Sequence, residues 1–133
     1  MSVAFHFRQN NNQPLDPGFI ESRLNGDLIV TNTGLLKETD KLRSFCVRSP
    51  KYDLNGWEEE GGLCFVWSEW EEDDNLMHSA YSVSGLHLKD KKLTVNIINL
   101  LADVARKLAF VIDDPQTGKK GISPDYFISL YVT

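Results

Sequence analysis

Hydrophobic and polar residues alternate over several short segments of the chain, the pattern of strands that place one face on a core. Residues 3–7 (VAFHF) alternate in this way, with both phenylalanines on one face. Compact apolar segments at 27–31 and 42–47 also predict strands. An Asn-Thr-Gly sequence at 32–34 predicts a turn after the first of these, and Ser-Pro at 49–50 predicts the end of the second.

The most apolar of the predicted strands is 63–70 (LCFVWSEW), which is hydrophobic on both faces and therefore favours a central position in a sheet. The acidic residues that follow are expected to connect it to a partner strand at 77–88, in a hairpin or a longer β-loop. Residues 110–113 predict another strand that ends in a tight turn, and 126–132 (YFISLYV) predict a last one.

Two segments have the apolar spacing of amphipathic helices. Residues 93–110 carry a continuous apolar stripe, with two basic residues in the last turn where they complement the helix dipole. A short helix is predicted after Asp16-Pro17, an N-cap followed by proline, and ends at Asn25-Gly26. These elements predict a single α+β domain over 1–133, with one mostly antiparallel sheet and one long and one short helix packed on one face.

The composition, with 41% hydrophobic and 25% charged residues, is that of an ordinary globular domain. No apolar segment reaches the 18 or so residues of a membrane helix, and the first residues lack the layout of a signal peptide. We therefore expect a cytoplasmic protein with no membrane partner. In that reducing compartment Cys46 and Cys64 are expected to be buried free thiols rather than a disulfide or metal ligands.

Acidic residues are concentrated in the middle of the chain. No Lys or Arg lies between Lys51 and Lys89, whereas this stretch holds nine of the 19 acidic residues. The remainder has 14 basic and ten acidic residues, a net charge of +4. The overall charge of −5 disfavours direct binding of nucleic acid or of an anionic membrane. A basic protein is therefore the partner that the charge distribution favours.

Two acidic clusters flank the apolar strand at 63–70, in a segment that contains all three tryptophans. Tryptophan anchors among carboxylates suit an interface, in which the indoles supply desolvated area and the carboxylates steer a basic partner. The alternative is a pair of solvated loops that keep the protein soluble. Trp67 is expected in the core. The candidate partner-binding residues are Trp57, Glu58, Glu59, Glu60, Glu69, Trp70, Glu71, Glu72, Asp73 and Asp74.

No motif for catalysis, metal binding or cofactor binding is complete. The TGKKG sequence at 117–121 lacks the Ser or Thr and the following helix of a phosphate-binding loop. The acidic clusters lack the alternation of a calcium loop, and His6, His78 and His87 lack metal-ligand spacing. We therefore expect no cofactor, no metal and no catalytic residue. A small enzyme that uses His78, His87 and nearby acids between sheet and helix remains an alternative, as does an oligomerising structural subunit.

The segment LADVARKLAFVIDDPQTG (101–118) resembles a passage in small bacterial α+β proteins, among them immunity proteins that neutralise polymorphic toxins. The resemblance implies a cytoplasmic, non-catalytic protein that caps the active site or another essential surface of a toxin. An acidic surface agrees with it independently, because nuclease toxins carry basic substrate grooves that carboxylates can mimic. The sequence thus predicts a protein-binding inhibitor of a basic protein such as a nuclease toxin, and leaves the oligomeric state open.

Overall fold

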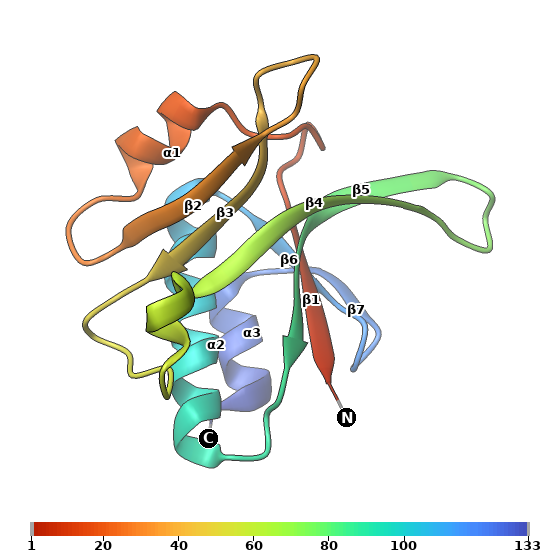
Figure 1. The fold of residues 1–133 in the computed structure, drawn as a ribbon. Coiled ribbons are helices and arrows are strands. Elements are labelled where there is room, and N and C mark those ends of the chain that lie inside the picture. Colours follow the sequence, from red (N-terminus) through yellow and green to blue (C-terminus); the bar gives the residue numbers. More distant parts are fainter. Residues whose placement is uncertain (1, 133) are drawn as a thin grey trace.

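The computed structural model describes residues 2–132, which form one seven-stranded antiparallel sheet and three α-helices (Figure 1). The strand order is β2-β3-β4-β5-β1-β6-β7. The strands are Val3–Arg8 (β1), Ile29–Leu35 (β2), Leu42–Arg48 (β3), Leu63–Glu71 (β4), Met77–Leu86 (β5), Val111–Asp114 (β6) and Lys119–Ile122 (β7). The helices are Pro17–Arg23 (α1), Lys91–Leu108 (α2) and Pro124–Tyr131 (α3), with a 3₁₀ helix, η1, at Trp57–Glu60. The predicted α+β class with a mostly antiparallel sheet is confirmed.

Helices α2 and α3 lie side by side behind the sheet in Figure 1, and α1 contacts α2. The apolar stripe predicted for 93–110 is the buried face of α2, and Asp90 caps the helix by accepting a hydrogen bond from the Leu93 backbone N–H at 2.9 Å. The short helix predicted after Asp16-Pro17 is α1. Over residues 2–132, no helix is both long enough and apolar enough to cross a membrane.

Aromatic side chains fill the space between the sheet and the helices. Phe5, Phe7, Phe45, Phe65 and Tyr81 are fully buried and belong to one hydrophobic cluster. The rings of Phe45 and Phe65 stack on neighbouring strands with centroids 4.9 Å apart. Because successive strand residues point to opposite faces, the residues between these aromatics point away from the helices.

The opposite face of the sheet, which we call the open face, carries no α-helix among the described residues (Figure 1). Val66, in the interior strand β4, is accordingly 41% exposed. The register aligns one row of residues on this face across the five strands from β3 to β6: Ser44, Val66, Ser82, His6 and Asp113. Side chains far apart in sequence therefore meet on the open face.

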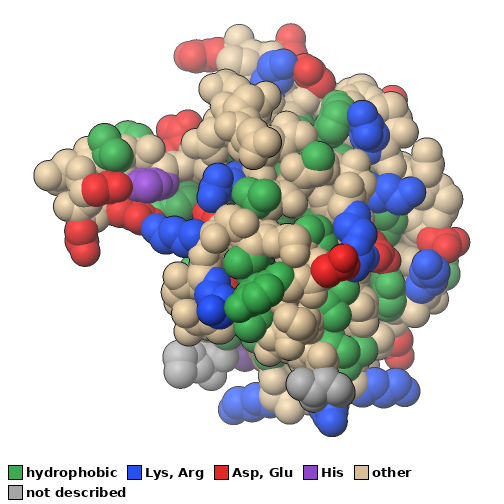
Figure 2. Space-filling model, turned by 180° about the vertical axis from the view of Figure 1, so that it is seen from behind, with side chains coloured by type: hydrophobic (Ala, Val, Ile, Leu, Met, Phe, Trp, Pro, Cys, Tyr) green, Lys and Arg blue, Asp and Glu red, His purple; other side chains and the backbone are tan. Residues whose placement is uncertain are grey.

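The β4–β5 hairpin extends beyond the rest of the sheet as a projecting arm (Figures 1 and 2). Its strands pair from Val66–Ser82 out to Glu71–Met77, as the hairpin prediction expected. In Figure 2 the arm is the lobe at the left, where acidic, histidine and hydrophobic side chains gather. The arm leaves a hollow between itself and the sheet, and this hollow holds the candidate site.

The β6–β7 turn, predicted from its sequence, is organised by a buried carboxylate. Asp114 is 1% exposed, and its Oδ1 accepts hydrogen bonds from the backbone N–H and side-chain amide of Gln116 at 2.9 and 2.7 Å. Its Oδ2 accepts from Thr117 at 3.0 Å and from the Tyr131 hydroxyl at 2.6 Å. Gln116 also donates to the carbonyl of Ala4 at 2.9 Å. The turn is thereby tied to both β1 and α3.

Residues 126–132, which the sequence predicts as a strand, instead form the last six residues of helix α3 and its C-cap, Val132. Ser123 caps the helix by accepting a hydrogen bond from the Tyr126 backbone N–H at 3.1 Å, and Pro124 occupies the first helical position. Phe127 and Tyr131 lie four residues apart on one face, with ring centroids 4.8 and 5.4 Å from that of Phe5. Packing overrides the strand propensity of these aromatic residues, so the fold has three helices rather than one long and one short.

Strand β2 is longer than the sequence predicts. The Asn-Thr-Gly sequence at 32–34 does not end the strand but produces an irregular pairing with β3 between Thr31 and Leu35. Asn32 adopts a left-handed backbone with φ of 51°. Asparagine tolerates this conformation well, so the residues that predicted a turn form a bulge within the strand.

The expectation of free thiols is wrong, because Cys46 and Cys64 form a disulfide. They lie directly opposite each other on β3 and β4, with Cα atoms 4.0 Å apart. Facing side chains on neighbouring strands point to the same side of the sheet and come within bonding distance. The pairing depends on the strand register, which the separate sequence segments do not reveal.

Candidate functional site

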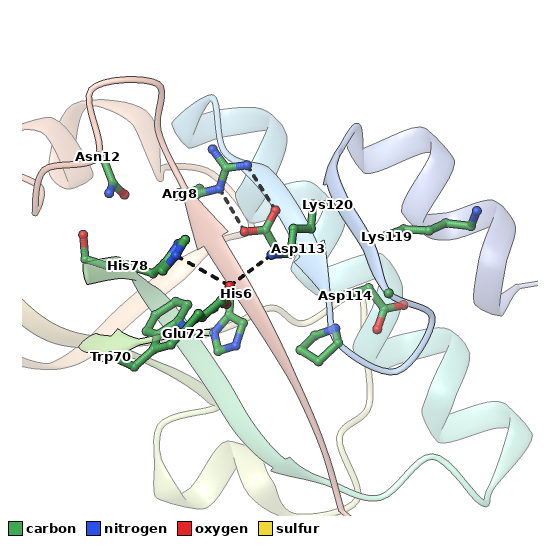
Figure 3. A pocket seen from close by; sticks show the side chains of 13 residues that line it. His6, Arg8, Asn12, Trp70, Glu72, His78, Asp113, Asp114, Lys119 and Lys120 are labelled. Atoms are coloured by element: carbon green, nitrogen blue, oxygen red, sulfur yellow. Dashed lines mark hydrogen bonds and ion pairs between the residues drawn. The ribbon is translucent and has the colours of Figure 1, made fainter. Parts of the chain in front are cut away.

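A hollow of about 450 Å³ lies on the open face between the β4–β5 hairpin and the β6–β7 turn (Figure 3). Strands β1, β4, β5 and β6 and the residues after β6 all contribute to its wall. The side chains that give it its chemistry are His6, Arg8, Trp70, Glu72, His78, Asp113 and Lys120. The site therefore combines an indole and two imidazoles with both acidic and basic groups.

His6 stands on β1 at the floor of the hollow. Its Nδ1 shares a hydrogen bond with the Ser82 hydroxyl, 2.7 Å away on the neighbouring strand β5. Partial burial lowers the pKa of His6, while the negative charges of Asp113 and Glu72 act in the opposite direction without overcoming it. The ring is therefore neutral at pH 7, with one nitrogen that donates and one that accepts a hydrogen bond.

Trp70 links the hairpin to the floor of the hollow. Its indole stacks on His6, with ring centroids 4.6 Å apart and an interplanar angle of 26°. It also lies nearly parallel to the imidazole of His78, the residue opposite it on β5, at 6.0 Å. The indole N–H donates to Glu72 Oε1 at 3.0 Å. A single side chain thus orders both histidines and one carboxylate.

Glu72, Asp74 and His78 form a cluster at the end of the hairpin, which we call the His78 cluster. His78 Nε2 lies 3.2 Å from Asp74 Oδ2 and 3.5 Å from Glu72 Oε2. Lys120, from β7, places its Nζ 3.3 Å from the same Glu72 oxygen (Figure 3). Hydrogen bonds from Trp70 and Lys120 lower the pKa of Glu72, and the Leu76 backbone N–H and His78 lower that of Asp74. Both carboxylates are therefore ionised at neutral pH.

Arg8 on β1 and Asp113 on β6 form an ion pair beside His6, on the side away from the hairpin. The guanidinium donates to both carboxylate oxygens, at 2.9 and 3.2 Å (Figure 3). The Gly121 backbone N–H also donates to Asp113, at 2.7 Å. Within residues 2–132, no carboxylate is hydrogen-bonded to His6, and Asp113 is held by other donors. The Ser82–His6 pair consequently lacks the orienting acid of a hydrolase triad.

The structure places the two predicted acidic clusters at opposite ends of β4. Residues 57–60 form η1 before the strand, and 69–74 lie at its other end and in the hairpin. At about 3.3 Å per residue, the nine residues of the strand span roughly 27 Å. The ten candidate residues therefore do not form one continuous acidic surface, because the extended strand β4 separates the two clusters by its whole length.

The cluster at 57–60 is partly structural. The Glu58 carboxylate accepts hydrogen bonds from the backbone N–H groups of Leu54 and Gly56, which hold the turn that precedes η1. Trp57 is half-buried and packs against the core rather than standing out as an anchor. Glu59 and Glu60 are exposed and make no ion pair in the described part of the chain.

The cluster at 69–74 divides into two sets. Trp70, Glu72 and Asp74 belong to the hollow and the His78 cluster described above. Glu69, Glu71 and Asp73 are exposed, and no ion pair to them occurs between residues 2 and 132. Leu76 and Met77 lie beside them, with 61% and 65% of their surface exposed. The hairpin end thus presents apolar side chains next to uncompensated carboxylates.

Several residues of the site are not foreseen from the sequence. His6, Arg8 and Lys120 reach the hollow from β1 and β7, and their positions depend on the strand order. The alternation in 3–7 places His6 opposite the core phenylalanines, and this is the one local signal that could have indicated it. His78 and His87, the residues of the enzyme alternative, lie far apart, near the start of β5 and just after its end, and His78 is on the open face rather than between sheet and helix.

Comparisons of the chain with protein-family models, curated proteins and solved structures found no match.

Proposed function

We propose that the protein is a non-catalytic, protein-binding inhibitor of the immunity-protein kind, which docks the end of its β4–β5 hairpin on a basic surface of its partner. A nuclease toxin is the partner class that this chemistry suits best. The observation that carries the proposal is the projecting hairpin end, where exposed Leu76 and Met77 lie beside exposed, unpaired carboxylates.

The apolar part of the hairpin end supplies contact area. Protein interfaces combine a desolvated apolar centre with a polar rim, and a few well-buried anchors carry most of the binding energy. Leu76 and Met77 are the two most exposed large hydrophobic side chains of the described residues. Methionine is unbranched and adapts to irregular partner surfaces. These two residues are the anchors of the proposal.

The acidic part of the hairpin end supplies charge. Glu69, Glu71 and Asp73 lack an ion-pair partner in residues 2–132, whereas Glu72 and Asp74 are partly matched by Lys120 and His78. Unpaired carboxylates around an apolar centre raise the association rate with a basic partner. The proposal therefore narrows the docking surface to the hairpin end and leaves out Trp57 and Glu58–Glu60.

Site-specific photo-crosslinking in the source cells tests the proposal. A photoreactive residue at position 76 or 77 should capture one basic protein, whereas the same residue at position 59, on η1, should not. The captured protein, once purified, should associate more slowly with E71Q/D73N than with the wild type, and the difference should be largest at low salt. The matched η1 variant E59Q/E60Q should associate at the wild-type rate. Impairment by the η1 variant alone would contradict the proposal.

The disulfide bears on the compartment in which this inhibitor acts. Disulfides persist in oxidising compartments and are rare in the cytoplasm. Two free thiols at Cys46 and Cys64 in protein taken from its source cells would agree with the predicted cytoplasmic location. An intact bond, measured by alkylation and mass spectrometry before any oxidation in air, would place the protein in an oxidising compartment.

A further inference from the structure

We infer that Glu72, Asp74 and His78 form a binding site for a divalent transition-metal ion, of which Zn²⁺ is the type, at the end of the β4–β5 hairpin. The site lies at the same hairpin end as the docking surface but uses other side chains, and it does not depend on the docking proposal. One ligand atom from each residue, the imidazole nitrogen and one oxygen from each carboxylate, lie within 4.8 Å of one another.

The distances from the imidazole nitrogen to the two carboxylates are close to those in a zinc site. Zn²⁺ binds imidazole nitrogen and carboxylate oxygen at about 2.0–2.2 Å in tetrahedral coordination, so its ligand atoms lie roughly 3.3–3.6 Å apart. His78 Nε2 is 3.2 Å from Asp74 Oδ2 and 3.5 Å from Glu72 Oε2. An ion can therefore enter with only small side-chain movements. It would bind the Nε2 lone pair of the neutral imidazole, whose one ring proton then lies on Nδ1.

Neighbouring groups hold all three ligands in position. The Trp70 indole donates to the Glu72 oxygen Oε1 and stacks beside His78, so one residue orients two ligands. The backbone N–H of Leu76 donates to Asp74 Oδ1 at 2.9 Å, and both oxygens of this carboxylate lie near His78 Nε2, at 3.3 Å for Oδ1 and 3.2 Å for Oδ2. In known metal sites, hydrogen bonds from neighbouring groups to the ligand side chains fix the orientation of those ligands. Trp70 is in this sense a positioning residue.

Lys120 already places a positive charge at this point. Its Nζ lies 3.3 Å from Glu72 Oε2, the same oxygen that faces His78. The lysine side chain is 64% exposed, so it can swing into solvent when a metal ion takes over the carboxylate. Lys120 therefore acts as a competitor of the ion.

The donor set selects the class of ion. One imidazole and two carboxylates suit Zn²⁺ and its neighbours among the divalent transition metals. Ca²⁺ requires six to eight oxygen ligands, and the cluster offers too few of them.

Calorimetric titration of the tag-free protein with ZnCl₂ tests the site. We expect one ion per chain, with a dissociation constant below about 1 mM. H78Q and D74N should each weaken binding at least about tenfold, and W70F, which keeps a stacking ring but removes the donor to Glu72, should weaken it about tenfold. K120M should strengthen it. The matched controls E71Q/D73N, on the same hairpin, and H87Q should bind as the wild type does.

The wild-type chain provides a second readout that does not depend on the folding of any variant. In an NMR titration with ZnCl₂, the imidazole resonances of His78 should shift with the calorimetric midpoint while those of His87 stay in place. Absence of saturable binding would overturn the inference. So would H78Q binding with wild-type affinity, or a titration in which His78 does not move.

Discussion

His6 and Trp70 stack although they belong to β1 and β4, which are not neighbours in the sheet. Strand β5 lies between them, and its Ala80, which pairs with Ser68, is fully buried with a side chain too small to keep the two rings apart. The contact ties the projecting hairpin back to the open face. It therefore couples the hairpin end, where both proposals lie, to a histidine on the floor of the hollow.

This burial of His6 makes stability depend on pH. Burial lowers the pKa of His6 below its ordinary value of 6.5, so the unfolded chain takes up a proton more readily than the native state as the pH falls below 6.5. The contribution of neutral His6 to the free energy of unfolding is complete above pH 6.5, and it is lost as the pH falls through the pKa that His6 has in the native state. Between about pH 7.5 and about pH 5.5, the urea midpoint of H6Q should fall less than that of the wild type. An equal fall in H6Q and in the wild type would contradict the prediction.

Tyr131 anchors the end of α3 to the buried carboxylate of Asp114. Tyr131→Phe removes the hydroxyl that donates to this carboxylate, and we expect a loss of about 1.5–3 kcal/mol in the free energy of unfolding, measured in urea. Tyr126→Phe is the matched control on the same helix, because the Tyr126 hydroxyl makes no hydrogen bond within residues 2–132. Its effect should stay within about 0.5 kcal/mol. Equal effects of the two variants would show that the Asp114 contact contributes nothing.

The Cys46–Cys64 disulfide closes a loop with a sequence separation of 18. A cross-link that closes a loop of this size restricts the unfolded chain and thereby adds about 3 kcal/mol to the free energy of unfolding. Reduction of the wild type, or the double substitution C46A/C64A, should lower the free energy of unfolding by about that amount. A reductant should not change the double variant any further. Two titratable thiols in the denatured, unreduced protein would show that the bond is not formed.

The hairpin end should contribute to binding but not to stability. The double substitution L76S/M77S removes exposed side chains, so the free energy of unfolding should change by less than about 0.5 kcal/mol. Affinity for the captured partner should fall at least about tenfold, mostly through faster dissociation, since apolar anchors hold the formed complex. Leu35→Ser is the control, because Leu35 is 51% exposed on the distant strand β2. A loss of affinity in the control alone would move the interface away from the hairpin.

Elements with a local signal were predictable. Helix α2 follows from an apolar stripe that continues over its whole length, β1 from strict alternation, and α1 from Asp16-Pro17. The prediction for α3 was wrong because its aromatic residues favour strands. Phe127 packs on Phe5, and this contact with a distant strand, which the segment alone does not show, favours the helix. Hydrophobic periodicity distinguishes a helix from a strand only in a long segment with one clear pattern, and residues 126–132 are too few to show one.

The site itself could be predicted only in part. The sequence indicates Trp70, Glu72 and Asp74 but not His6, Arg8 or Lys120. It also groups Trp57 with residues that lie at the other end of β4. Periodicity and caps act between residues a few positions apart, so the chain encodes them directly. The disulfide, the stack of His6 on Trp70 and the His78 cluster depend on strand order, register and the reach of the hairpin. Those are settled only when the whole sheet packs on its helices, because many long-range contacts must form together before any one of them is defined.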